Sequence, residues 1–264
     1  MTSEYTEYKS IALSREDDIL LVRLHRDGGP LEFSMDAHRE WVTLFREIAG
    51  DSQTRLVIIT GSGDSFMTPR KALPGGTDRS SLMTAQYWKF IMRHCAELVT
   101  AMLDIPVPVI AAVNGPARVH SEIALLNDIV IATPRAVFQD THLPEQVIPT
   151  DLQHVLIPAL IGRLRANYYF YTDQVIDAEE ALRLGLINEI VPADQLLERA
   201  HQIARHILRQ PDANLQYLRR ILTHELRGKM HDLLEYGLAV EGLAAIGADW
   251  SDWQVSLDGP PPLE

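Results

Sequence analysis

The sequence predicts an α/β fold in which buried strands alternate with helices. Apolar runs at residues 56–63 and 108–115 each end in a turn that contains glycine, and both are too short for typical helices. Between them, the pattern from Thr84 to Leu103 has the apolar spacing of a long helix. A buried strand, a crossover helix and a second buried strand are typical of a parallel sheet covered on both faces.

The first fifty residues predict a hairpin followed by a helix. Residues 10–13 and 19–25 are mostly apolar and flank a charged turn, so we expect them to pair. Residues 36–49 then place five apolar side chains on one helical face, and Gly50 follows as a stop signal. These five side chains are Ala37, Trp41, Leu44, Phe45 and Ile48.

Short strands are expected at residues 128–133 and 136–138, and the last third of the chain is predicted to be helical. Helical patterns cover residues 177–185, 194–209, 212–225 and 228–246. We therefore expect an α/β core over residues 1–200 and a helical region over residues 201–264. Such a helical block packs either on its own core or on a neighbouring subunit.

The composition is ordinary for a soluble globular protein, with 46% apolar and 23% charged residues. The net charge is −12, from 36 acidic and 24 basic residues, which argues against a nucleic-acid partner or an anionic membrane. Cys95 is the single cysteine, so no disulfide framework is possible. The N-terminus lacks the blocks of a signal peptide, and the apolar runs are shorter than the roughly 20 residues that span a bilayer. We expect a cytoplasmic location and, because no metal or nucleotide motif is present, no cofactor.

Residues 138–151 carry the main chemical clue. His142 and Asp151 lie nine residues apart in a loop that contains proline. A carboxylate that accepts a hydrogen bond from one imidazole nitrogen leaves the other nitrogen available to take a proton from water. Two simpler interpretations stay open: His142 as a structural histidine, and Asp151 as the N-cap of the following helix.

Four stretches, taken in order, resemble the signatures of the crotonase superfamily of enoyl-CoA hydratases and isomerases. They are residues 56–66, 108–133, 138–152 and 177–192, and they cover most of residues 10–200. The resemblance implies a crotonase-like spiral of ββα units with a C-terminal helical trimerisation region. It also implies a homotrimer or a dimer of trimers.

The chain departs from that family at the groups that bind a thioester. Pro69 stands where the family has a glycine, which reshapes the loop that presents the N–H of Thr68. No glycine follows Gly115 at once, and His120 stands where a backbone donor is expected. His142 occupies the position of a catalytic glutamate. The resemblance therefore places His142 at a catalytic position whose chemistry has changed.

The same departures resemble the β-diketone hydrolase branch, which includes 6-oxocamphor hydrolase and cleaves a carbon–carbon bond by a retro-Claisen reaction without coenzyme A. That resemblance implies a dyad of His142 and Asp151 as the base, His120 as the donor to a carbonyl, and Glu241 as a third polar group. It places four further residues around the substrate. They are Phe33, where the branch has a tryptophan, and His38, Thr68 and Glu122.

Two other functions remain open at this point. One is a hydratase or isomerase of CoA thioesters, against which the loss of both backbone donors argues. The other is a non-catalytic protein that binds a ligand or partner on the same fold, against which the set of histidines and carboxylates argues.

Overall fold

A mixed six-stranded sheet forms the centre of the molecule in the computed structural model, which describes residues 5–69 and 83–250. Its strands are β1 (Ile11–Glu16), β2 (Ile19–Leu24), β3 (Leu56–Thr60), β4 (Val109–Val113), β5 (Ile129–Ala132) and β8 (Glu189–Ile190), side by side in that order. β1 and β2 pair antiparallel, and the others are parallel. The predicted hairpin and the predicted parallel sheet are both confirmed.

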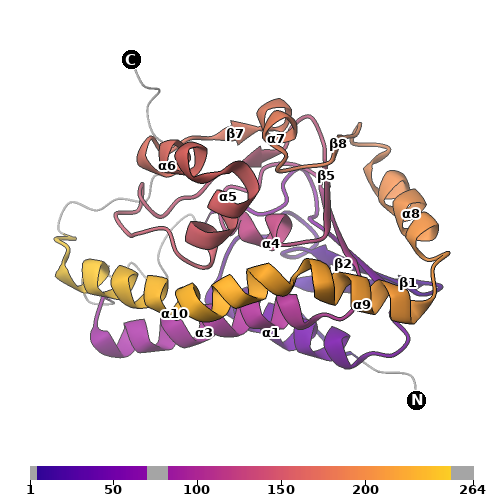
Figure 1. Ribbon diagram of the computed structural model, residues 1–264, viewed down its shortest axis with the longest axis horizontal. Coiled ribbons are helices and arrows are strands. Elements are labelled where there is room, and N and C mark those ends of the chain that lie inside the picture. Colours follow the sequence, from indigo (N-terminus) through magenta and orange to yellow (C-terminus); the bar gives the residue numbers. More distant parts are fainter. Residues whose placement is uncertain (1–4, 70–82, 251–264) are drawn as a thin grey trace.

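Helices cover both faces of this sheet (Figure 1). Val57 and Ile59 of β3 pack in the same cluster as α1 (Met35–Gly50) and α3 (Ala85–Asp104). Leu56 and Ile58, which point the other way, pack in a second cluster with α8 (Leu196–Ile207). Since both faces of β3 are buried, its sequence is a continuous apolar run rather than an alternating one.

α1 begins where the sequence predicts it. The hydroxyl of Ser34 caps the helix by accepting a hydrogen bond of 3.2 Å from the N–H of Ala37. The five side chains predicted to share one face are all buried. His38 is buried on the same helix, although it is polar.

A second, shorter ladder of β-bridges lies beside the main sheet. It joins loop residues from separate parts of the chain. Bridges join Glu32 to Thr68, Met67 to Ala117, and Ala117 to Phe138. β6 (Val137–Phe138) then pairs antiparallel with β7 (Ile176–Asp177). Segments that are far apart in the sequence therefore lie side by side, and each of them ends close to a predicted site residue.

The remaining helices are α4 (Glu122–Leu125), α5 (Gln153–Ile161), α6 (Arg163–Tyr171), α7 (Ala178–Leu184), α9 (Asp212–Leu222) and α10 (His224–Gly247). In the view of Figure 1, α5, α6 and α7 lie at the top, α4 near the centre, and α9 and α10 across the lower part. α6 was not predicted, and α10 begins four residues before the expected start. The boundary proposed at residue 200 falls inside α8. No helix in the described ranges is long and apolar enough to cross a membrane.

Two glycines bring α10 into close contact with α3 and α5. A Cβ atom at Gly242 would lie 2.0 Å from the indole of Trp88, and one at Gly237 would lie 2.5 Å from the ring of His154. The same two rings hold the helix, because Trp88 Nε1 donates to the carbonyl of Leu238 at 2.8 Å and His154 Nε2 donates to that of Leu233 at 3.1 Å. This packing sets the position of the neighbouring Glu241.

Candidate active site

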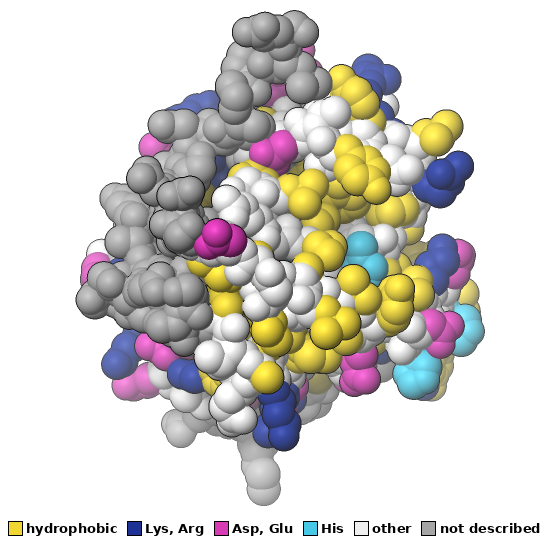
Figure 2. All heavy atoms as spheres, turned by 90° about the vertical axis from the view of Figure 1, so that its left-hand side faces the viewer, with side chains coloured by type: hydrophobic (Ala, Val, Ile, Leu, Met, Phe, Trp, Pro, Cys, Tyr) yellow, Lys and Arg dark blue, Asp and Glu magenta, His cyan; other side chains and the backbone are white. Residues whose placement is uncertain are grey.

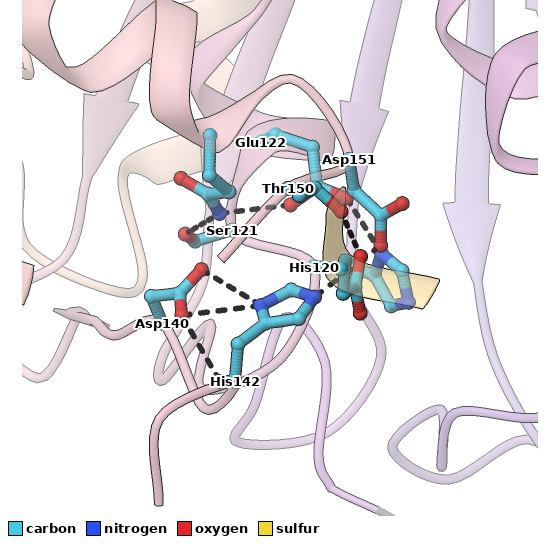
Figure 3. Close-up of polar contacts among 9 residues, drawn as sticks. His120, Ser121, Glu122, Asp140, His142, Thr150 and Asp151 are labelled. Carbon is cyan, nitrogen blue, oxygen red and sulfur yellow. Dashed lines mark hydrogen bonds and ion pairs between the residues drawn. The ribbon is translucent and has the colours of Figure 1, made fainter. Parts of the chain in front are cut away.

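His142 lies in the loop after β6, between two carboxylates (Figure 3). Its Nδ1 is 3.0 and 3.1 Å from the two carboxylate oxygens of Asp140, and its backbone N–H donates to Asp140 at 3.0 Å. Its Nε2 faces Asp151 at 3.6 Å, which is beyond good hydrogen-bond geometry. Asp140 is therefore the nearer of the two carboxylates, whereas the sequence predicts Asp151 as the partner of His142.

Asp151 is held in a strained turn at the start of α5. Its φ is 49°, and that of Leu152 is 70°, so two residues other than glycine adopt the left-handed conformation. The N-cap position of α5 is Leu152 and no side chain caps the helix, so Asp151 does not act as the N-cap. Cys95, which is buried on α3, lies next to the Asp151 carboxylate, and burial together with that carboxylate raises the pKa of its thiol.

His120 forms a second pair with Glu122, just before α4 (Figure 3). The Nδ1 of His120 donates to Glu122 Oε1 at 2.6 Å, and His120 also adopts a left-handed conformation with φ of 49°. The other oxygen of Glu122 accepts a hydrogen bond of 2.9 Å from Gln153, which also donates to Ser121 at 3.0 Å. Both oxygens of Glu122 thus have protein partners, and its carboxylate orients His120.

Glu241 reaches this cluster from α10. Its carboxyl group accepts a hydrogen bond from the hydroxyl of Thr150, the residue before Asp151. The side chain is buried, and burial raises the pKa of Glu241 to about 7. A carboxyl group with that pKa exchanges a proton readily near neutral pH.

The two histidines of the cluster favour the protonated form. Burial opposes their charge, but the carboxylate of Asp140 outweighs it and raises the pKa of His142 well above the usual value. Glu122 raises the pKa of His120 in the same way. Burial also opposes the charge of Asp151, yet the nearby positive charges of His142 and His120 keep its pKa low. Asp151 and Glu241 therefore have pKa values on opposite sides of the usual range for carboxyl groups.

A cluster of three rings, those of Phe33, His38 and Trp41, packs around the ring of His120. The ring of Phe33 is 4.3 Å from that of His120, and the ring of His38 is 5.9 Å from it. The ring of Trp41 lies 6.0 Å from His38 and 6.4 Å from His120. Of the four residues that the sequence places around the substrate, Phe33, His38 and Glu122 thus lie next to His120.

Thr68 is engaged elsewhere. Its N–H donates to the carbonyl of Leu31 at 2.9 Å, within the short ladder, and its hydroxyl donates to the same oxygen at 3.0 Å. The backbone donor that a thioester enzyme needs is therefore turned toward Leu31. Residues 70–82, which include Arg70 and Lys71, lie outside the described residues.

Asp140, Thr150, Gln153 and Cys95 belong to this cluster but were not selected from the sequence. The signal for Asp140 was present, because an aspartate two residues before His142 can accept from the backbone N–H of the histidine. The other three contacts join separate elements and have no local signature. Within the residues that the structure covers, no group of three or more His, Cys, Asp and Glu side chains is arranged to hold a metal ion.

The fold and the comparisons place the chain among known proteins. The parallel sheet, the short second ladder and the helical C-terminal part define an α/β protein of crotonase fold. Residues 14–239 match the Enoyl-CoA hydratase/isomerase family, and the chain belongs to that family. The resemblance read from the sequence motifs is confirmed.

Relatives within the family differ in what they are named for. Crotonyl-CoA hydratase of Syntrophomonas wolfei is 31% identical over 207 residues, which are 76% of each chain. The 1,2-epoxyphenylacetyl-CoA isomerase of Escherichia coli is 26% identical over 90% of each chain. These curated relatives are named for reactions of CoA thioesters.

A solved structure points to different chemistry. A β-diketone hydrolase from the cyanobacterium Anabaena sp. PCC 7120, bound to (S)-3-oxocyclohexyl acetic acid, is similar to this chain with a TM-score of 0.85 and 37% identity. The match covers 90% of this chain and 95% of the hydrolase. An enoyl-CoA hydratase/isomerase from Mycobacterium paratuberculosis is similar with a TM-score of 0.82 but is only 26% identical, over 93% and 97% of the two chains.

Proposed function

We propose that the chain hydrolyses a carbon–carbon bond of a cyclic or bicyclic β-diketone and releases a keto acid. The observation that carries this proposal is the half-buried imidazole of His142, held between Asp140 and Asp151 at the position where thioester hydratases keep a glutamate. The similarity to a β-diketone hydrolase supports it, because the acid bound to that protein is a keto acid. A keto acid is the product expected when water cleaves a 1,3-diketone.

The proposed reaction uses His142 as a general base. Neutral His142 takes a proton from water through Nε2 while the water oxygen bonds to one carbonyl carbon. The tetrahedral adduct then collapses, the bond to the carbon shared by both carbonyls breaks, and its electron pair forms an enolate at the second carbonyl. The proton held by His142 passes to that carbon, so that one diketone and one water give one keto acid.

His120 is proposed to stabilise the negative oxygen. Its Nδ1 is held by Glu122, which leaves Nε2 to face a ligand. Since its raised pKa favours the protonated ring, Nε2 carries a hydrogen that can be donated to an oxyanion. Glu241 supplies a third polar group that can receive or return a proton through its carboxyl group near neutral pH. No cofactor takes part in the proposed reaction.

A hydratase or isomerase of CoA thioesters is the second candidate, and the names of the curated relatives favour it. Such an enzyme binds the thioester oxygen with backbone donors. In this chain the N–H of Thr68 is bonded to Leu31, Pro69 supplies no N–H, and a histidine side chain replaces the second donor. The site therefore fits a diketone better than a thioester.

Two assays on the wild-type chain separate the candidates. The first follows, by ultraviolet absorbance, the loss of the bicyclic 1,3-diketone that gives 3-oxocyclohexyl acetic acid on hydrolysis. The second follows hydration of crotonyl-CoA. We expect turnover in the first only. Hydration of crotonyl-CoA without loss of the diketone would support the thioester reaction, and no turnover of either by the folded protein would favour a binding function.

We also propose that the C-terminal helices join copies of the chain in a trimer or a dimer of trimers. Arg219 anchors α9 to Asp128 at 2.7 Å, and this orientation leaves Tyr217 and Ile221 about two-thirds exposed. These two residues line a surface hollow of about 500 Å³ with Arg220 and His224. Leu218 and Leu222 of the same helix are also exposed. Contiguous patches of exposed apolar side chains commonly mark an interface between proteins.

Light scattering tests the assembly. The mass of the wild type should correspond to three or six chains of 29.7 kDa each. Ile221→Asp should reduce this mass toward that of a single chain. Leu164→Asp on α6 is the control, because Leu164 is also exposed but lies on another helix. Apolar side chains also gather on the face of the molecule that is on the left in Figure 1, as Figure 2 shows. A monomeric wild type, or an equal effect of the control, would refute the role of α9.

A further inference from the structure

The two carboxylates beside His142 hold it in different ways. Asp140 contacts Nδ1 with both of its oxygens and also accepts from the backbone N–H, so it fixes the ring and the loop together. Asp151 faces Nε2 across 3.6 Å, and its Oδ1 is buried without a hydrogen-bond partner among the described residues. A buried acceptor of this kind requires an explanation.

We propose that Asp140 is the positioning residue that orients His142, and that Asp151 instead acts with His142 Nε2 on the water that attacks the substrate. This inference rests on the proposed hydrolysis of a β-diketone for its kinetic part. Its structural part, the control of the His142 ring by Asp140, concerns the free protein and is tested without a substrate.

Asp140 is well placed to hold the ring. Only Gln139 separates Asp140 from the end of β6, which is paired with β7, so the backbone of Asp140 is close to a paired strand. The buried Tyr169 of α6 lies close to Asp140, and burial together with the Asp140 charge raises the pKa of its hydroxyl well above the usual value. The Asp140 side chain is 5% exposed, which keeps water from competing for its oxygens. A carboxylate fixed in this way favours the tautomer of neutral His142 that carries hydrogen on Nδ1.

With Nδ1 committed to Asp140, the lone pair of neutral His142 lies on Nε2 and points toward Asp151. A carboxylate and a lone pair 3.6 Å apart do not attract each other, but a water molecule that donates one hydrogen to each would satisfy both. The buried Oδ1 of Asp151 offers a further acceptor at the same place. In this arrangement, His142 takes the proton from water and Asp151 holds the second hydrogen and aligns the oxygen.

The charge of Asp140 also sets the basicity of His142. The charged or titratable groups that act on the ring are Asp140 in its own loop, Asp151 before α5, His154 on α5, Glu241 on α10, and His120 before α4. Asp140 contributes most to the raised pKa of His142. Because the base must be neutral to act, kcat/KM should rise with pH through the His142 pKa, which gives the acidic limb of the pH profile. Loss of the Asp140 charge should move this acidic limb to lower pH.

Three variants of the full chain test the inference. Asp140→Asn removes the charge but keeps an oxygen that can accept from Nδ1, Asp140→Ala removes both, and Asp151→Asn alters the other partner. The matched control is Asp173→Asn, because Asp173 lies near Asp140, whose charge helps raise the pKa of Asp173 to about 6. NMR of isotope-labelled histidines, with the His142 signal assigned from His142→Gln, reports the pKa and the tautomer of the ring.

We expect Asp140→Asn to lower the pKa of His142 by about one to three units and to move the limb of kcat/KM by the same amount. Asp140→Ala should also lose the Nδ1–H tautomer and reduce kcat by on the order of 100-fold or more, with KM changed by less than about threefold. Asp151→Asn should keep the Nδ1–H tautomer, and Asp173→Asn should match the wild type.

Two results would overturn the inference. One is a His142 signal that titrates and keeps its tautomer in Asp140→Ala as in the wild type. The other is loss of the Nδ1–H tautomer in Asp151→Asn, which would make Asp151 the orienting carboxylate. Since these NMR results need no substrate, an absence of diketone turnover by the wild type would refute the proposed function without deciding the role of Asp140.

Discussion

His142 and His38 are both shielded from water, but they belong to regions with opposite electrostatics. His142 lies between two carboxylates, and its pKa is raised well above the usual value despite burial. His38 lies among the rings of Phe33, Trp41 and His120, and in the described part of the chain neither of its ring nitrogens has a hydrogen-bond partner. Burial lowers the pKa of His38 to about 3, with a smaller effect from the charge of His120.

The contrast shows that burial by itself makes a histidine neutral, and that a directed carboxylate reverses the effect. His120 stands at the boundary of the two regions, since Glu122 contacts its Nδ1 while Phe33 packs on its ring at 4.3 Å. For the proposed reaction, the aromatic region suits the apolar body of a cyclic diketone. The carboxylate region suits its carbonyl groups and the attacking water.

The largest effect is expected from breaking the charged region. His142→Ala should reduce kcat for the diketone by about 10²–10⁴, because it removes the general base. His206→Ala is the control, since His206 is exposed on α8 and lies outside both regions. Initial rates in the ultraviolet assay measure the effect. A His142→Ala variant that keeps most of the wild-type turnover would exclude His142 as the base.

The aromatic region can be tested through stability against acid. His38 has a folded pKa of about 3 and an ordinary value of 6.5, so the unfolded chain binds the extra proton first. His38 therefore destabilises the fold increasingly as the pH falls from about 6.5 toward 3. His38→Leu removes this proton uptake. Between pH 7 and 4.5 it should lose about 2–3 kcal/mol less stability than the wild type, measured by urea unfolding at each pH.

An equal loss of stability in His38→Leu and the wild type would show that His38 is hydrated or paired in solution. The control for this experiment is His206→Leu, because His206 is exposed on α8 and lies outside both regions. The loss of stability of this variant between pH 7 and 4.5 should match that of the wild type.

A smaller effect is expected where α10 carries Glu241 into the charged region. Gly242→Ala places a methyl group 2.0 Å from the indole of Trp88, and overpacking of this kind costs about 1–3 kcal/mol. Gly228→Ala on the same helix is the matched control, because a Cβ there meets no atom within 4 Å. It should be neutral or more stable by up to about 1 kcal/mol. Urea unfolding compares the two, and equal stabilities would mean that α10 does not pack tightly on α3.

Much of the fold follows from local patterns in the sequence. The alternation of buried strands and amphipathic helices predicted the hairpin, the parallel strands and the buried face of α1. α6 was missed because its residues, RLRANYYFY, have no clear apolar face, and both Leu164 and Tyr171 are exposed. The start of α10 was misplaced because a single residue, Thr223, separates it from α9.

Less of the site could be predicted in this way. The motifs identified His142, Asp151, His120 and Glu241 as candidates, and the structure brings them into one buried cluster. It also shows that Thr68 is engaged by Leu31 and that Glu122 orients His120. The partner of each ring nitrogen could not be read from spacing, because Asp140 and Asp151 are both close to His142 in the sequence.

The sequence alone therefore determined the hairpin, the alternation of strands and helices, the buried face of α1 and the main candidate residues, because periodicity and motifs are properties of short segments. The tertiary structure decided that Asp140 holds Nδ1, that Asp151 faces Nε2, and that His38 is left without a partner. These outcomes depend on distances that differ by less than 1 Å. Such distances are set by contacts between remote segments, such as the short ladder at Ala117 and the close packing of Gly242 on Trp88.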